Sequence, residues 1–147
     1  MDWKTLAIDK LKDYTVKRQS LEILPMEIAE LESTMTSIKS SSSGASVSAK
    51  GGGVVRNDDM LLSCIVKIEE LQRNLDQAKL WIKAVDKGLD ILDPTDRNIL
   101  DRFYINPARG NVDRLCEELF IEKSTLYKRK DTALRKFTIA LYGCTES

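Results

Sequence analysis

The 147-residue chain contains no histidine, and this absence restricts the chemistry that the protein can carry. Histidine is the commonest general base of enzymes and the commonest metal ligand. The three cysteines, Cys64, Cys116 and Cys144, cannot all pair within one chain and form no metal-binding CxxC motif. The sequence therefore argues against a disulfide scaffold, a zinc finger and a Ser-His-Asp hydrolase, and we expect no metal and no other cofactor.

Long apolar runs and an excess of one charge are also absent. No stretch approaches the roughly 18 apolar residues of a membrane span, and Asp2 stands where a signal peptide carries a basic start. We therefore expect a cytoplasmic protein with no membrane partner. The formal net charge is zero, but residues 124–142 hold five basic side chains against one acidic side chain.

Residues 2–38 carry the pattern of one long helix. From Leu21 to Ile38 the apolar side chains recur in alternating steps of three and four residues, as in the buried stripe of an amphipathic helix. Pro25 lies inside this pattern, where it removes a backbone donor and crowds the preceding turn. Because the periodicity continues past Pro25, we predict a kink or a short break between two collinear helices.

The next segment, residues 39–57, is rich in serine and glycine and has no acidic residue. This composition is typical of a flexible linker, because it offers few apolar side chains to bury. A phosphate-binding loop is the alternative reading of its glycines. However, no GKS or GKT sequence follows and no strand-like segment precedes it, which favours the linker.

Residues 58–91 carry the most regular apolar repeat of the chain, which predicts a second long helix packed on the first. Because the linker is longer than a tight helical turn, the two helices could pair within one chain or between two chains. The residues expected to be buried are Leu61, Cys64, Ile68, Leu71, Leu75, Ala78, Ile82, Val85, Leu89 and Leu92.

Three shorter helices are predicted after residue 92. The Asp-Pro-Thr-Asp segment at 93–96 has an aspartate N-cap and a proline in the first turn, and its helix should run to about Ile105. Asn111 is expected to cap a second helix, and Ser124-Thr125 to open a third. A short helix, a tight turn and a longer basic helix together indicate a helix-turn-helix. The residues expected to be buried on the last two helices are Val112, Leu115, Cys116, Leu119, Leu126, Ala133, Leu134, Phe137 and Leu141.

These patterns predict an all-α protein with two domains and a short tail. Residues 1–92 should form a long helical hairpin or coiled coil that contains the flexible linker. Residues 93–142 should form a C-terminal three-helix domain with the helix-turn-helix, and residues 143–147 the tail.

Residues 112–137 resemble the helix-turn-helix of the region-four domain of bacterial sigma factors, which reads a promoter element. The run Ala-Leu-Arg-Lys-Phe at 133–137 is especially similar to the Ala-Leu-Arg-Lys-Leu of that family. Together with the long N-terminal helical part and the Asp-Arg-Asn-Ile-Leu helix at 96–100, the architecture resembles the ArpU/RinA-type phage and prophage transcriptional regulators. The resemblance covers the C-terminal third of the chain. It implies a sequence-specific DNA-binding regulator of phage or prophage late genes.

The resemblance also implies that the third helix lies in the major groove with its first residues at the base edges. Serine and threonine hydroxyls can bond several base edges, whereas lysine prefers guanine acceptors or phosphate. The residues at the contacting positions are Lys123, Ser124, Thr125, Tyr127 and Lys128. Those expected to attract phosphates irrespective of sequence are Lys130, Arg135, Lys136, Arg109 and Arg114.

Three residues depart from the sigma-factor pattern. Phe120 falls in the turn, where these modules place a small residue able to adopt a left-handed conformation. Arg129 falls where they have an aliphatic core residue, so its stem should pack while its head reaches out. Glu122 replaces the usual serine or threonine cap.

We expect double-stranded DNA as the partner, with RNA polymerase as a second candidate partner. We also expect a homodimer or higher oligomer formed through the helical coil, located in the nucleoid of a bacterial host. Dimerisation would double the contact that one small module makes with DNA. One alternative is a non-enzymatic adaptor whose coil binds RNA polymerase or another phage protein. Another is a DNA-packaging recognition subunit that forms a ring. We do not expect an enzyme, because the paired acids lie at adjacent positions that point to different helix faces.

Overall fold

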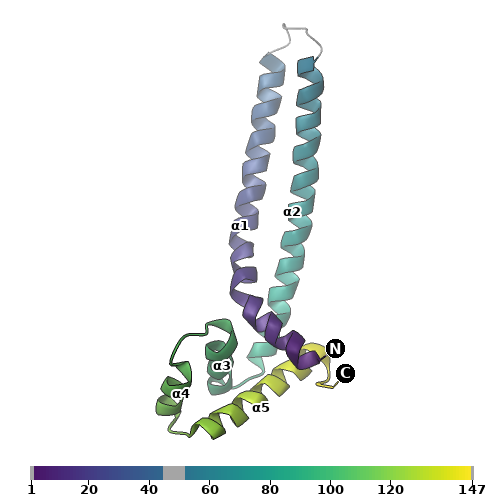
Figure 1. The fold of residues 1–147 in the computed structure, drawn as a ribbon. Coiled ribbons are helices and arrows are strands. Elements are labelled where there is room, and N and C mark those ends of the chain that lie inside the picture. Colours follow the sequence, from purple (N-terminus) through teal and green to yellow (C-terminus); the bar gives the residue numbers. More distant parts are fainter. Residues whose placement is uncertain (1, 45–51, 147) are drawn as a thin grey trace. The chain divides into compact units, whose positions relative to one another are not determined.

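Figure 1 shows the fold in a computed structural model, which describes residues 2–44 and 52–146. Every regular element in these two ranges is helical, which confirms the predicted all-α class. Contacts divide the chain into two compact units, the hairpin unit (Gln19–Lys79) and the terminal unit (Met1–Arg18 with Leu80–Ser147). The elements in chain order are α1 (Trp3–Gly44), α2 (Gly52–Asp90), α3 (Pro94–Leu100), the π-helix η1 (Asp101–Ile105), α4 (Asn111–Leu119) and α5 (Lys123–Tyr142).

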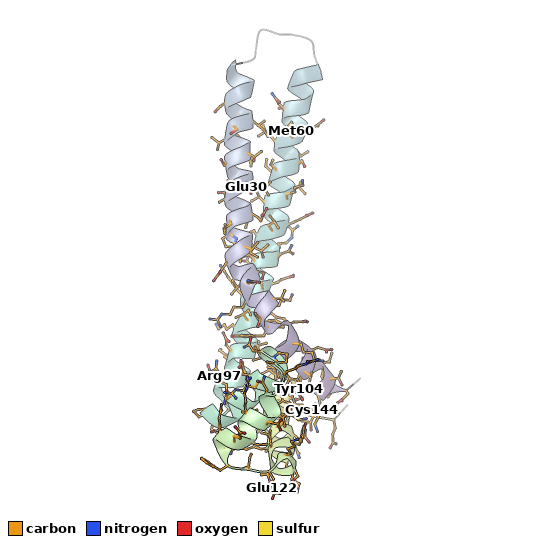
Figure 2. All side chains as sticks on the ribbon, turned by 60° about the vertical axis from the view of Figure 1, so that its left-hand side comes forward. Glu30, Met60, Arg97, Tyr104, Glu122 and Cys144 are labelled. Atoms are coloured by element: carbon orange, nitrogen blue, oxygen red, sulfur yellow. The ribbon has the colours of Figure 1, made fainter. Side chains whose placement is uncertain are left out.

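In the hairpin unit, α1 and α2 lie side by side and run in opposite directions (Figures 1 and 2). The apolar positions predicted from the periodicity line this contact, because they alone bring a continuous apolar stripe to each helix. The two apolar stripes, which form the seam between α1 and α2, are therefore paired within one chain. Its buried or half-buried residues are Leu21, Leu24, Ile28, Leu31, Met35 and Ile38 on α1, and Leu61, Cys64, Ile68, Leu71, Leu75 and Ala78 on α2.

The predicted linker over 39–57 was too long at both ends. α1 continues to Gly44 and α2 already begins at Gly52. Serine and glycine lower helix propensity by up to about 1 kcal/mol per residue, which does not stop a helix that is already propagating. The rest of that prediction, residues 45–51, lies outside the described residues. The short break predicted at Pro25 is not observed, since α1 is one helix through that position.

The terminal unit contains the first turns of α1 as well as the end of α2, so the predicted division at residue 92 does not match the structure. Ala7 and Leu11 of α1 are fully buried. The Tyr14 hydroxyl donates to the carboxylate of Asp86 on α2 and accepts from Arg18 Nη1 at 2.7 Å. The rings of Trp3 and Tyr142 lie 5.0 Å apart, which places the start of α1 beside the end of α5 (Figure 1).

Gly88 on α2 allows the close approach of α5. A Cβ atom at this position would lie 2.9 Å from Cε1 of Phe137 and 3.3 Å from Cδ2 of Leu141. The Phe137 ring is completely buried, so it cannot move aside into solvent. The glycine is needed here for space, in a helix interior where glycine is otherwise unfavourable.

We therefore predict that Gly88→Ala destabilises the protein. Alanine gains about 1 kcal/mol of helix propensity, but overpacking against a buried ring costs about 1–3 kcal/mol. Urea denaturation should show a lower midpoint for the variant. In a Phe137→Leu background, where the ring is gone, the same substitution should be neutral or stabilising. A Gly88→Ala variant more stable than the wild type would contradict the packing argument.

From the raised pKa of the Tyr14 hydroxyl we predict that the protein loses stability in alkaline solution. Burial raises its pKa above the ordinary 10.0, and the hydrogen bond to Asp86 and the charge of that carboxylate raise the pKa further. The folded state thus favours the protonated phenol. This contribution to stability is complete below pH 10.0 and is lost as the pH rises through the higher pKa of the folded state.

For the variant Tyr14→Phe we expect a loss of about 1 kcal/mol at neutral pH and a shallower decline above the unfolded-state pKa of about 10. Urea denaturation measured over a pH series tests both. Burial and the charge of Asp9 also raise the pKa of Tyr142, so Tyr14→Phe/Tyr142→Phe should flatten the decline further. A wild-type stability that does not fall in alkali would contradict the assignment.

Candidate nucleic-acid interface

The helix that supports the candidate interface, α3, begins as the sequence predicts. Asp93 is its N-cap, and the Asp93 side chain accepts a hydrogen bond of 2.8 Å from the backbone N–H of Asp96. The regular α-helix ends at Leu100 rather than at Ile105, because the backbone widens into η1. There the N–H of Asn106 donates to the carbonyl of Asp101, five residues back, at 2.7 Å.

The cap predicted for α4 is wrong by one residue. Gly110 is the N-cap, with a left-handed φ of 78° that favours glycine. Asn111 is the first residue of the helix, and its side-chain amide donates instead to the carbonyl of Arg102 at 2.9 Å. The asparagine thus fastens the start of α4 to the end of the preceding helical segment.

α4, the turn at 120–122 and α5 form a helix-turn-helix. Phe120 takes the left-handed conformation at the turn (φ 55°, ψ 46°), as expected for this position, although a side chain there is unfavourable. The backbone N–H groups of Phe120 and Ile121 both donate hydrogen bonds to the carbonyl of Cys116. The Phe120 side chain is 92% exposed, so the turn presents an aromatic ring to solvent. Glu122 is the N-cap of α5, but its side chain makes no capping hydrogen bond.

A small apolar core fixes the two helices of the motif. Ile99 of α3, Leu115 of α4 and Leu126 of α5 are completely buried against one another. The predicted apolar faces of α4 and α5 are confirmed, since their residues are buried or half-buried. The half-buried side chains packed around this core are Phe103, Val112, Cys116, Leu119 and Ile121.

An ion pair connects α5 to the start of α3. Arg129 Nε donates to Asp96 Oδ1 at 3.0 Å, and Arg129 Nη2 lies 3.8 Å from Asp93 Oδ2. The Asp96 side chain is only 7% exposed, so its carboxylate needs this partner. The sequence predicted that the Arg129 head reaches solvent, but the head turns to α3 instead.

The exposed side of α5 begins at the turn. Five predicted contact residues, Lys123, Ser124, Thr125, Tyr127 and Lys128, lie in its first two turns, and all are exposed. Ser124 and Lys128 are four residues apart and Arg135 follows seven residues later, spacings that place all three on one side of a helix. Lys136 is also exposed, so α5 presents a polar and basic surface along much of its length. Figure 2 shows the labelled Glu122 at the start of this helix.

Two of the predicted contact residues are held by aromatic packing. Tyr127 contacts Phe103 edge to face, with ring centroids 5.8 Å apart. Lys130 Nζ lies 5.3 Å from both ring centroids and 3.4 Å from Asp131 Oδ1, and its side chain is largely buried. The structure therefore does not support the prediction that Lys130 offers a free cation to phosphate.

Two of the remaining basic residues that were predicted to contact DNA lie off α5. Arg109, in the segment before α4, and Arg114, on α4, are both exposed. Lys123 pairs with Asp113 at 3.4 Å. The sequence did not single out Arg102, which pairs with Glu118 at 3.0 Å. A pocket of about 340 Å³ at the start of α4 is lined by Arg102, Lys123 and Tyr127 among others.

The described residues contain neither a metal-binding cluster nor a membrane-spanning helix. Among residues 2–44 and 52–146, no group of cysteine and acidic side chains could hold a metal ion. No helix in the same part of the chain is long and apolar enough to cross a membrane.

The geometry defines an all-α protein with a helix-turn-helix at its C-terminal end. The chain belongs to the family described as "Protein of unknown function (DUF1492)", whose model matches residues 38–138. That match includes every residue predicted here to contact DNA. No curated protein and no solved structure matches the chain.

From the ion pair between α3 and α5 we predict that Arg129→Met destabilises the protein. Methionine keeps an apolar stem but leaves the buried Asp96 carboxylate without its cation, which should cost about 1–3 kcal/mol of unfolding free energy. Chemical denaturation tests this, with Arg135→Met on the exposed side of α5 as the control, expected within about 0.5 kcal/mol of the wild type. Equal stability of the two variants would show that the ion pair contributes nothing.

Proposed function

We propose that the protein binds double-stranded DNA sequence-specifically and regulates transcription of phage or prophage genes. The observation that carries the proposal is the exposed polar start of α5, where Ser124, Thr125 and Lys128 project from a helix fixed behind them by Leu126 and Arg129. A rigid helix whose first turns are free to enter a major groove is the arrangement that helix-turn-helix proteins use to read bases.

The side chains of this surface suit both parts of DNA recognition. The hydroxyls of Ser124 and Thr125 can bond base edges, and Lys128 can bond guanine or phosphate. Arg135 and Lys136, one to two turns further along, would neutralise phosphates and contribute affinity that falls with salt. Arg109 and Arg114 add positive charge on neighbouring elements, whereas Arg129 and Lys130 are paired with carboxylates of the same chain.

A single module of this size gives modest affinity, because specific DNA complexes usually bury more surface than one small domain offers. The proposed regulator therefore acts as a homodimer or higher oligomer, and RNA polymerase is a further partner in this proposal. Because the α1–α2 seam is filled within one chain, self-association has to use another surface.

We predict that Thr125→Ala/Lys128→Ala weakens specific DNA binding at least tenfold, since each lost base contact is worth about 1–3 kcal/mol. Fluorescence anisotropy with labelled duplexes from DNA flanking the gene, and with scrambled duplexes, measures this at two salt concentrations. The slope of log affinity against log salt should fall by about one for the lost lysine. A matched control is Lys12→Ala/Thr15→Ala, which removes the same exposed residue types from α1.

The control variant should bind like the wild type. Equal binding of flanking and scrambled duplexes, unaffected by Thr125→Ala/Lys128→Ala, would reject the proposal and leave α5 as a solvated surface. The adaptor alternative, in which the hairpin unit binds another protein, would then be favoured by the apolar side chains that α2 exposes at Leu62, Ile65 and Val66.

A further inference from the structure

The terminal unit carries an apolar groove between the end of α2 and the second half of α5, with a volume of about 630 Å³. Ala84 on α2 and Ala140 on α5 line it as small, exposed residues, so a side chain of another molecule can come close to both helices. Ile91 and Ile139 also line the groove, and they are 59% and 41% exposed. Nothing in the described residues covers these two isoleucines, although both are large and apolar.

The charge at this groove is positive. Lys87 and Lys136 belong to its lining, and both are exposed. No acidic residue lines the groove among the described residues. An occupant that suits it therefore combines branched apolar side chains with carboxylates.

The hairpin unit exposes a surface with this combination, which we call the outer face of α2. Leu62, Ile65 and Val66 are 61%, 41% and 44% exposed. Their spacing of three and four residues puts them on one side of the helix, away from the seam that contains Cys64 and Ile68. Four carboxylates flank this face, two on the turn before it and two on the turn after it, namely Asp58, Asp59, Glu69 and Glu70. They outnumber the one basic residue of this stretch, Lys67 beside Val66.

We propose that the outer face of α2 in one copy of the chain binds in the groove of the terminal unit in a second copy. The apolar side chains of the face would cover Ile91 and Ile139, and the flanking carboxylates would meet Lys87 and Lys136. Self-association of this kind is heterologous, because two different surfaces of the chain meet.

Charge decides against the two symmetric pairings. Two outer faces placed together would bring four carboxylates of one copy against four of the other. Two grooves placed together would bring lysines against lysines. Like charges at an interface suppress such pairings, whereas face in groove joins opposite charges around an apolar centre.

A second acidic surface on α1 is the weaker occupant. Ile23 and Met26 are 50% and 70% exposed and lie near Glu22, Glu27 and Glu30 in the sequence. This patch offers two apolar side chains where the outer face of α2 offers three. An apolar contact grows with the area removed from water, so α2 is favoured.

The test measures the mass of the full chain by size-exclusion chromatography with light scattering, at concentrations up to tens of micromolar and without DNA. The wild type should reach at least twice the 16.6 kDa of one chain. Leu62→Lys on the outer face and Ile91→Glu in the groove should each give the monomer mass. Both positions are exposed, so the substitutions should leave the circular dichroism spectrum and the unfolding midpoint unchanged.

Mixing the two variants provides the decisive measurement. The Leu62→Lys chain keeps an intact groove and the Ile91→Glu chain keeps an intact outer face. A mixture should therefore regain a species of twice the monomer mass, although neither variant associates alone. Leu80→Lys and Ile23→Glu, at exposed apolar positions outside both surfaces, are the matched controls and should associate like the wild type.

Four results would overturn the proposal. The first is a wild-type mass that stays at 16.6 kDa over the whole concentration range. The second is association of Leu62→Lys or Ile91→Glu equal to that of the controls. The third is a mixture that stays monomeric, which would indicate a symmetric interface. The fourth is loss of association in Ile23→Glu but not in Leu62→Lys, which would assign the contact to α1.

Discussion

The burial of one face of α5 is the constraint on which the terminal unit depends. Near its start this face carries Leu126, which packs with Ile99 and Leu115. Near its end it carries Phe137, whose ring leaves no room for a side chain at position 88. Two separate sets of contacts therefore fix the rotation of one helix about its axis. Because that rotation is fixed, the polar side of α5 has to face solvent. The proposed DNA-binding surface requires this fixed orientation.

The ion pair of Arg129 reduces the number of basic side chains that α5 can offer to DNA. Composition gives residues 124–142 five basic side chains against one acidic side chain. Arg129 is bound to Asp96, and Lys130 is packed on two aromatic rings beside Asp131. Of these five, only Lys128, Arg135 and Lys136 remain on the exposed side. Fewer cations of this helix are thus available to phosphate than its composition suggests. In the proposed complex, base contacts by Ser124 and Thr125 would supply a larger share of the affinity.

Local patterns predicted the helices, but they could not predict which helices pack together. The three-four periodicity identified both seams, and the Asp93 cap followed from residue type and order. The division into units depends on contacts between distant residues, such as the hydrogen bond from Tyr14 to Asp86, 72 positions away. No local pattern contains that information. The grouping of Trp3 to Arg18 with the C-terminal helices was therefore missed.

Smaller errors at the candidate site have local causes. Gly110 and Asn111 both suit a helix start, and only the backbone shows that the glycine holds the left-handed position. The π-helix at Asp101–Ile105 has the same residue types as a regular helix, so no local pattern indicates it. Arg129 was recognised as a departure from an aliphatic core position. Its partner could not be named from the sequence, because Asp96 lies 33 residues away.

The distribution of charge is consistent with the different partners proposed for the two units, DNA for the terminal unit and protein for the hairpin unit. Residues 19–79 hold nine acidic side chains against six basic ones, so the hairpin unit is less suited to bind DNA phosphates than the terminal unit. Lys136 is the one residue that both proposals use, on the exposed side of α5 and in the groove. A lysine bound to a carboxylate of another copy is less available to a phosphate. Competition for Lys136 would therefore offset part of the affinity that a second copy adds to DNA binding. Linkage requires that the same coupling acts on self-association when DNA binds.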